Sequence, residues 1–426
     1  MTDFDQIPED LNELIHNWDD RSQSKVKREI TIDDETLRDG LQSPSVKNPS
    51  LKEKLDIVRM MVNLGITTAD MGLPGSGAEG VADFDELITN IIKEKIEILP
   101  RAACRTHEAD LTALAKLSQK HGITIFNDMF IASSKIRRFA EGWHFADVKD
   151  TVYKALAFTQ QENLPTMFVL EDATRSKPEE LEQLFYLAID NGVERLCLTD
   201  TVGYATPEAT RNIVLFTRNL IKKAGVEGKV KLDWHGHNDR GLALSCALAA
   251  IDVGADQIHG CALGIGERTG NTPIELLLVN LQMAGLWDHD LHRLPDYCQT
   301  VSHAVGVQIP KNWPVIGRDA FATSTGVHAA AILKAHKRGQ NKFSDYVYSS
   351  VPASNFGFEQ LIRIGFMSGK SNVIWMLDKL NIKPDPELVS YVLGIAKSHR
   401  KQIDYEDLKC LVEDFKKNKK KESKQN

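Results

Sequence analysis

Short runs of apolar and β-branched residues alternate with longer segments of helical periodicity along most of the chain. Successive runs are separated by roughly thirty residues, the length of one strand-and-helix unit. Eight runs are predicted as strands: residues 29–34, 67–72, 96–102, 123–131, 165–171, 195–199, 229–235 and 255–263. Because each strand is followed by a helix, the pattern predicts an α/β protein with a (β/α)8 TIM barrel over residues 29–290.

An open, doubly wound sheet is the competing architecture for the same alternation. Such a sheet usually carries a glycine-rich loop after its first strand, whereas here the residues are DETLRDGLQSP. After residue 290 the rhythm changes, and residues 291–415 are predicted as a mostly helical C-terminal subdomain. Residues 1–28 are polar and charged and are predicted as an N-terminal extension. Residues 416–426 are rich in lysine and are predicted as a disordered basic tail.

Capping residues indicate where three of the helices begin. Ser50 followed by Glu53 forms a capping box, and Ser176 with Glu179 repeats it. The dipeptide Thr-Pro at 206–207 places a capping hydroxyl before a proline at the first helical position.

Composition narrows the class of protein. The 426 residues include 52 Lys and Arg against 59 Asp and Glu, and the net charge of −7 disfavours nucleic acid as a partner. No apolar run is long enough for a membrane helix, and the acidic N-terminus has no signal-peptide pattern, so a cytoplasmic protein is expected. The six cysteines include no CxxC pair, which is typical of free thiols in a reducing compartment.

In a barrel the active site lies at the C-terminal ends of the strands. Here the first strand is followed by Arg38 and Asp39, and the seventh ends in His235 and His237, which alternate along the strand and therefore face the same side. Barrel closure makes strands 1, 7 and 8 neighbours. Asp39, both histidines and, more weakly, Asn271 after strand 8 are therefore predicted to bind Mg²⁺, Mn²⁺ or Zn²⁺. Singly, each feature also fits a salt-bridged loop or a hydrogen-bonded core histidine.

Strands 5 and 6 end in polar residues as well. Glu171 is a candidate for acid–base chemistry, and Thr201 offers a hydroxyl that could hold a substrate carboxylate. Both also fit ordinary cap and turn positions.

Five segments together resemble a family of metal-dependent barrel enzymes: the 2-isopropylmalate, homocitrate and citramalate synthases and the hydroxymethylglutaryl-CoA lyase. The segments are DETLRDGLQ (34–42), EDATR (171–175), DTVGYATP (200–207), HGHND (235–239) and GIGERTGN (264–271). Three later segments resemble the linker region of the synthases, which the lyase lacks: FATSTGVHAAAILK (321–334), YSSVPASNFG (348–357) and MSGKSN (367–372). The resemblance favours the synthase branch, and within it the 2-isopropylmalate synthase type of leucine biosynthesis. It also implies a form without the C-terminal regulatory domain, and hence no end-product inhibition through it.

The resemblance implies an acyltransferase that performs a Claisen condensation. The carbanion of acetyl-CoA attacks the ketone of a 2-oxo acid, and thioester hydrolysis releases CoA. The acceptor expected first is 2-oxoisovalerate, giving 2-isopropylmalate; pyruvate or 2-oxoglutarate, a C–C lyase and a non-catalytic metal-binding relative are the alternatives. Arg38 would stabilise the oxyanion and Thr201 would hold the substrate carboxylate. Glu171 and His328 would abstract the proton, with Tyr348 as a further participant. In the synthases the linker region covers the partner's barrel, so a homodimer is implied.

Several positions depart from the family's pattern and are predicted to line the pocket for the acceptor's side chain. Leu41 stands where many members carry a polar residue, and Arg137, after Ser134, stands where many carry a histidine. Thr323 and Asp70 also differ from the usual His and Glu. Leu41 suits an apolar acceptor, whereas Arg137 could pair with a second carboxylate, so the choice of acid stays open.

Overall fold

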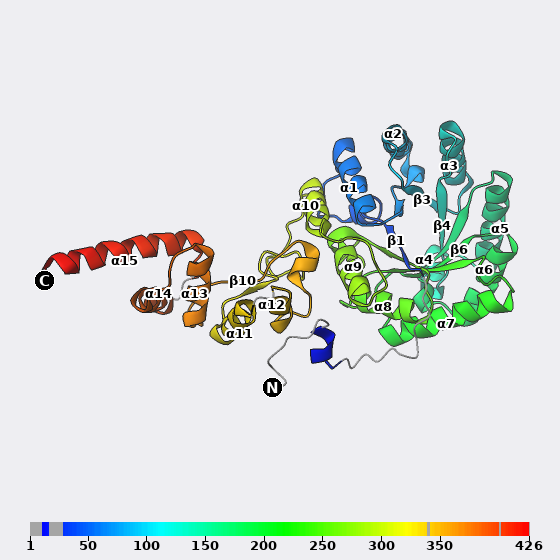
Figure 1. The fold of residues 1–426 in the computed structure, drawn as a ribbon. Coiled ribbons are helices and arrows are strands. Elements are labelled where there is room, and N and C mark those ends of the chain that lie inside the picture. The colour runs from blue at the N-terminus through cyan, green and yellow to red at the C-terminus, as the bar shows by residue number, and fades with distance from the viewer. Residues whose placement is uncertain (1–10, 17–28, 339–340, 400–401, 426) are drawn as a thin grey trace. The chain divides into compact units, whose positions relative to one another are not determined.

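The computed structural model describes residues 11–16, 29–338, 341–399 and 402–425. Most of the predicted N-terminal extension lies outside the described residues, apart from 11–16, which include a 3₁₀ turn at Leu11–Leu14. The chain forms two compact units (Figure 1). One spans Ser22–Ile309, and the other combines Met1–Arg21 with Pro310–Asn426.

The first unit is a closed barrel of eight parallel strands in sequence order. The strands are β1 (Thr31–Asp34), β2 (Thr68–Asp70), β3 (Leu99–Arg105), β4 (Phe126–Ala132), β5 (Thr166–Glu171), β6 (Arg195–Asp200), β7 (Lys231–Gly236) and β8 (Gln257–Gly260). β8 closes the barrel by pairing with β1, with Asp33 opposite His259. The predicted TIM barrel is therefore confirmed, and strands 1, 7 and 8 are neighbours.

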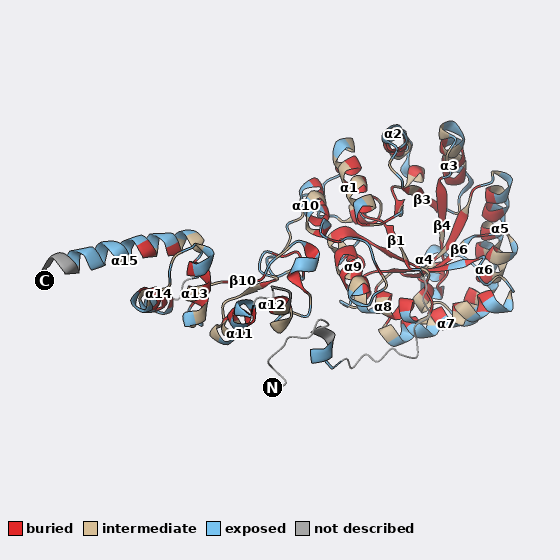
Figure 2. Cartoon of the chain, in the orientation of Figure 1, coloured by how far each residue is buried: buried red, intermediate tan, exposed pale blue. Residues whose placement is uncertain are grey.

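Ten helices of this unit are described, and they surround the strands with their outer faces exposed (Figure 2). They are α1 (Leu51–Asn63), α2 (Ala78–Glu94), α3 (Glu108–His121), α4 (Lys135–Glu141), α5 (Phe145–Gln161), α6 (Pro178–Asp190), α7 (Pro207–Lys223), α8 (Ala243–Val253), α9 (Ile274–Met283) and α10 (Leu294–Val305). On α1 the spacing of Leu55, Val58 and Met61 places all three on one face, and all three are buried.

Two of the three predicted helix starts are confirmed. The side chain of Ser50 accepts from the backbone N–H of Glu53, and the hydroxyl at position 206 caps α7. The predicted capping box at Ser176 is wrong, because α6 begins at Pro178 and its N-cap is Lys177. Ser176 instead donates from its hydroxyl to the carbonyl of Asp172.

The barrel unit extends past the predicted boundary at residue 290. Helix α10 was assigned to the second region from its helical pattern, but it packs on α1. From α10 the Tyr297 hydroxyl donates to Asp34 at the end of β1, and it lies 3.3 Å from the hydroxyl of Thr36. These buried contacts place residues 294–305 in the barrel unit, which ends at Ile309.

Charged side chains fill much of the barrel interior, where most TIM barrels carry branched apolar residues. Arg101 is 1% exposed and donates to Asp128 at 2.7 Å and to Gln257 at 2.8 Å. Arg195 donates to Asp233 at 2.7 Å. These ion pairs and hydrogen bonds link neighbouring and non-adjacent strands inside the barrel.

The second unit is mostly helical, as predicted. It contains α11 (Gly326–Lys337), α12 (Asn341–Val347), α13 (Lys370–Lys379), α14 (Pro386–His399) and α15 (Tyr405–Gln425), with a short parallel pair of β9 (Ala322–Thr323) and β10 (Leu361–Ile362). Its core includes Ile332, Met376, Val392 and Leu408.

The C-terminal tail differs from the prediction of disorder after residue 415. Helix α15 continues to Gln425. Lysine and glutamate are good helix formers, and Lys419 lies 2.6 Å from Glu387 on α14, so the basic segment continues the helix. Among the described residues, no helix is both long enough and apolar enough to cross a membrane.

Candidate active site

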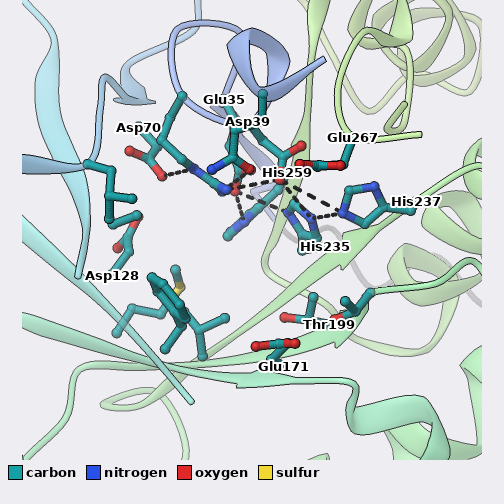
Figure 3. A pocket seen from close by; sticks show the side chains of 18 of the residues that line it. Glu35, Asp39, Asp70, Asp128, Glu171, Thr199, His235, His237, His259 and Glu267 are labelled. Atoms are coloured by element: carbon teal, nitrogen blue, oxygen red, sulfur yellow. Dashed lines mark hydrogen bonds and ion pairs between the residues drawn. The ribbon is translucent and has the colours of Figure 1, made fainter. Parts of the chain in front are cut away.

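A pocket opens at the C-terminal ends of the barrel strands (Figure 3). One side of it is polar, with carboxylates and histidines contributed by the ends of β1, β2, β7 and β8. The other side includes apolar side chains from β3, β4 and β5: Ala103, Phe130, Met167 and Val169. Glu171 and Thr199 lie across the pocket from Glu35 and Asp39.

Three predicted metal ligands meet on the polar side. One potential ligand atom each from Asp39, His235 and His237 lies within 4.8 Å of the other two, and all three side chains are buried. The Nε2 atoms of the two histidines are 3.2 Å apart, and each lies 3.8 Å from Oδ2 of Asp39. One carboxylate and two imidazoles in this arrangement match the donors of a divalent cation site.

Two buried polar atoms beside this cluster have no hydrogen-bond partner among the described residues: Oδ1 of Asn271 and Nδ1 of His237. Asn271 donates from Nδ2 to Asp39 Oδ1 at 2.7 Å, so its amide lies against the cluster. Burial, and the neighbouring His235, lower the pKa of His237 to about 4, so this imidazole is neutral near pH 7 and keeps a lone pair for a cation. These residues therefore fit a bound metal.

The charge balance points the same way. The guanidinium of Arg38 contacts three buried carboxylates: Glu35, Asp39 at 2.9 Å and Asp70 at 2.7 Å. Burial raises the pKa of Asp70 to about 8 even though Arg38 opposes the shift. Arg38 alone therefore does not offset the burial of Asp70, and a divalent cation at Asp39 would add positive charge on this side of the pocket.

A second group of potential ligands shares His235 and adds Glu35 and His259. In His259, Nδ1 lies 2.7 Å from Glu35 and Nε2 lies 3.2 Å from Asp233. Burial alone would lower the pKa of His259, but these hydrogen bonds raise it to about 10. With both ring nitrogens carrying hydrogen, His259 has no lone pair to give to a metal, so this second group is held together by hydrogen bonds.

Glu171 and Thr201 both line the pocket. Glu171 accepts a hydrogen bond from Nε of Arg137 at 3.0 Å. The hydroxyl oxygen of Thr201 accepts from the backbone N–H of Asp172 at 2.8 Å, which leaves its own hydrogen to be donated elsewhere.

Three residues predicted to contact the acceptor lie outside the lining of this pocket: Leu41, Ser134 and Arg137. Leu41 lies in a 3₁₀ turn at Gly40–Gln42. Ser134 is buried as the N-cap of α4, and its hydroxyl donates to Asp172. Arg137 is already bound to two carboxylates, Glu171 and Glu141.

His328 and Tyr348 belong to the second unit. Their rings stack with centroids 4.1 Å apart, and Nδ1 of His328 lies 3.4 Å from the hydroxyl of Thr323. Within this unit the two predicted participants are therefore in direct contact.

Sequence reasoning missed His259 and the apolar wall. His259 had a signal, because it alternates with Gln257 along β8 and so lies on the same side of the strand. The wall had no comparable signal, because Phe130, Met167 and Val169 have the composition of ordinary core residues.

Residues 29–301 match the protein family described as HMGL-like. A putative (R)-citramalate synthase from Methanopyrus kandleri is 29% identical over 91% of this chain and 72% of its own length. A homocitrate synthase from the same organism is 29% identical over 87% of each chain. A 2-isopropylmalate synthase from Pyrococcus abyssi is 31% identical over 72% of this chain, which covers 63% of that enzyme.

Among solved structures, an HMG-CoA lyase from Acinetobacter baumannii is similar with a TM-score of 0.55 and 20% identity, covering 66% of this chain and 92% of the lyase. At that identity the similarity concerns the barrel fold.

Proposed function

Because the chain belongs to the HMGL-like family, with 2-isopropylmalate, homocitrate and citramalate synthases as its relatives, we propose that it condenses acetyl-CoA with a 2-oxo acid and depends on a divalent cation. We take 2-oxoisovalerate as the acceptor, with 2-isopropylmalate and CoA as products. The observation that carries the proposal is the buried cluster of Asp39, His235 and His237 beside Arg38.

Asp39, His235 and His237, with Asn271 as a weaker ligand, would hold Mg²⁺, Mn²⁺ or Zn²⁺. When bound, such a cation polarises the keto oxygen of the acid as a Lewis acid. Although burial opposes it, the three surrounding carboxylates hold the pKa of Arg38 above its ordinary value, so the guanidinium stays charged. Arg38 would stabilise the negative charge that develops on the keto oxygen.

The remaining roles fall to side chains farther from the cluster. Thr201 would donate its free hydroxyl hydrogen to the acceptor's carboxylate. Glu171 would take part in removing the α-proton of acetyl-CoA, together with His328 and its stacked neighbour Tyr348.

The apolar side of the pocket supports an acceptor with an apolar side chain. A second carboxylate on the acceptor would meet Phe130, Met167 and Val169, with Asp128 and Glu171 also in the lining. Two arginines contact lining residues on this side, and both are already paired. Arg137 is bound to Glu171 and Glu141, and Arg101 is bound to Asp128. A buried carboxylate without a cation is costly, which favours 2-oxoisovalerate over 2-oxoglutarate.

Thiol release from acetyl-CoA tests the proposal. The chelator-treated protein is assayed with each divalent cation and with 2-oxoisovalerate, pyruvate, 2-oxobutyrate and 2-oxoglutarate in turn. We expect release only when acid and cation are both present, with the highest kcat/KM for 2-oxoisovalerate. If none of the four acids triggers thiol release, the synthase assignment is contradicted. A preference for 2-oxoglutarate would contradict the choice of acceptor alone.

A further inference from the structure

The two imidazoles of the proposed metal cluster are held differently. Nδ1 of His235 lies 3.2 Å from Oε1 of Glu35, and both groups are buried. Nδ1 of His237 is buried without a hydrogen-bond partner among the described residues. His235 is therefore fixed on the side away from the cluster, and His237 is not.

Glu35 determines which nitrogen of His235 carries the hydrogen. Its Oε2 accepts from Arg38, and its Oε1 lies near both His235 and Nδ1 of His259, the latter at 2.7 Å. Both oxygens of this carboxylate already face donors, Arg38 and His259, so it is an acceptor toward His235 as well, and the hydrogen belongs to Nδ1 of His235. The lone pair is then on Nε2, the atom that lies 3.8 Å from Oδ2 of Asp39.

His259 contacts the same oxygen of Glu35 as His235 does. Its other nitrogen, Nε2, lies 3.2 Å from Oδ2 of Asp233, and Asp233 accepts hydrogen bonds from Arg195 at 2.7 and 2.8 Å. The four residues lie on β6, β7 and β8 and directly after β1, so a continuous series of hydrogen bonds ties the Glu35 carboxylate to the barrel wall.

We propose that His259 is a positioning residue for cation binding. It orients the Glu35 carboxylate, and Glu35 keeps His235 in the tautomer whose Nε2 faces the cation. This inference rests on the metal site of the proposed function. Partners behind a metal ligand fix its ring orientation and raise its basicity, and their loss typically weakens metal affinity about 10–100-fold.

The test measures cation affinity without substrate. Mn²⁺ is titrated into chelator-treated protein, and free Mn²⁺ is followed by electron paramagnetic resonance. We expect the Kd of His259→Gln and of Glu35→Gln to rise about 10–100-fold over the wild type. His121→Asn is the matched control, because it breaks a histidine–carboxylate pair (2.6 Å, with Asp85) on the outside of the barrel and should keep the wild-type Kd.

Two further measurements separate positioning from general damage. If His259 acts through Glu35, the double variant should bind Mn²⁺ no more weakly than the weaker single variant, whereas multiplied effects would contradict the proposal. Imidazole ¹⁵N spectra of the metal-free wild type, with the His235 signals assigned by their loss in His235→Ala, should show its hydrogen on Nδ1. A hydrogen on Nε2 would overturn the proposal without relying on the folding of a His259 variant.

The outcomes also distinguish the two levels of the argument. A wild-type protein that binds no Mn²⁺, Mg²⁺ or Zn²⁺ removes the metal site and with it the proposed function. A wild type that binds Mn²⁺ while His259→Gln, with an unchanged melting temperature, binds it equally well removes only the role of His259.

Discussion

Single carboxyl groups inside this barrel hold their protons with different strengths because their neighbours differ. Burial raises the pKa of Asp34 to about 6, although hydrogen bonds from Thr36 and Tyr297 oppose the shift. Asp233 is equally buried, but Arg195 and His259 outweigh the burial and hold the pKa of this carboxyl below its ordinary value. A charged partner thus decides whether a buried carboxylate stabilises the fold at neutral pH.

The Asp34 carboxyl should make the barrel less stable as pH rises. Between its ordinary pKa of 3.8 and its raised pKa of about 6, the folded protein keeps a proton that the unfolded chain has lost. The contribution of Asp34 to the free energy of unfolding is therefore most favourable below pH 4 and is lost by pH 6. The change is about 3 kcal/mol. We therefore expect the stability of Asp34→Asn, relative to that of the wild type, to increase by about 3 kcal/mol between pH 4 and pH 7, as measured by urea unfolding.

A difference between Asp34→Asn and wild type that stays constant over this pH range would contradict the prediction. Asp85→Asn is the control, because its stability relative to the wild type should change with pH in the opposite direction. Hydrogen bonds from Lys120 and His121 lower the pKa of Asp85, so this surface carboxyl stabilises the fold as pH rises.

The loop of residues 264–271 after β8 needs a glycine where its backbone passes close to Asn271 and Asp39. Gly266 has φ 145°, and a Cβ there would lie 2.1 Å from Nδ2 of Asn271 and 2.9 Å from Oδ1 of Asp39. Only a residue without a side chain lets this loop approach Asp39 and Asn271 so closely.

Gly266→Ala should therefore disturb the proposed metal site more than the fold. The added methyl displaces Asn271 and Asp39, and we expect the Kd for Mn²⁺ to rise at least about tenfold. Gly225→Ala is the matched control, because Gly225 also has positive φ (71°) but its Cβ would meet nothing within 4 Å. Equal Mn²⁺ affinity in the two variants would refute the role given to the loop.

How far sequence predicts such elements depends on how local the deciding interaction is. The third strand was predicted at 96–102 and runs from Leu99 to Arg105, because apolar pattern marks a strand but not its hydrogen-bonded ends. The cap of α6 was misplaced because the proline at 178 takes the first helical position. Helix α10 was assigned to the wrong unit, since only its packing on α1 reveals its place.

The closed topology of the barrel made it predictable that Asp39, His235 and His237 lie together. Asp39 and His235 are almost two hundred residues apart, yet the closure of β8 on β1 brings their strand ends together. The pairing of Glu35 with His259 and the apolar wall depend on side-chain directions and strand register, which the sequence pattern does not give. The predicted tail also failed, because the contact of Lys419 with Glu387 is tertiary.

The second unit exposes an apolar surface around His328. Val327 is 70% and Tyr348 46% exposed, and both flank the histidine, while Met367 is 62% exposed and its carbonyl accepts from the N–H of Gly326. Exposed apolar side chains gathered in this way are typical of surfaces that contact another molecule. Following the family resemblance, we propose a homodimer in which each barrel receives His328 from its partner, and we expect this surface to contact that partner.

Complementation between two inactive variants tests that assembly. His237→Ala removes a proposed metal ligand and His328→Ala removes the proposed base, so each alone should be inactive. If His328 acts on the partner's barrel, co-refolded mixtures contain heterodimers with one intact site, and random pairing should restore about a quarter of wild-type activity. If His328 acts within its own chain, no mixed dimer has an intact site and activity stays at background. Mixing either variant with the double variant is the control and should restore nothing, whereas sedimentation should give a mass near twice 47.6 kDa.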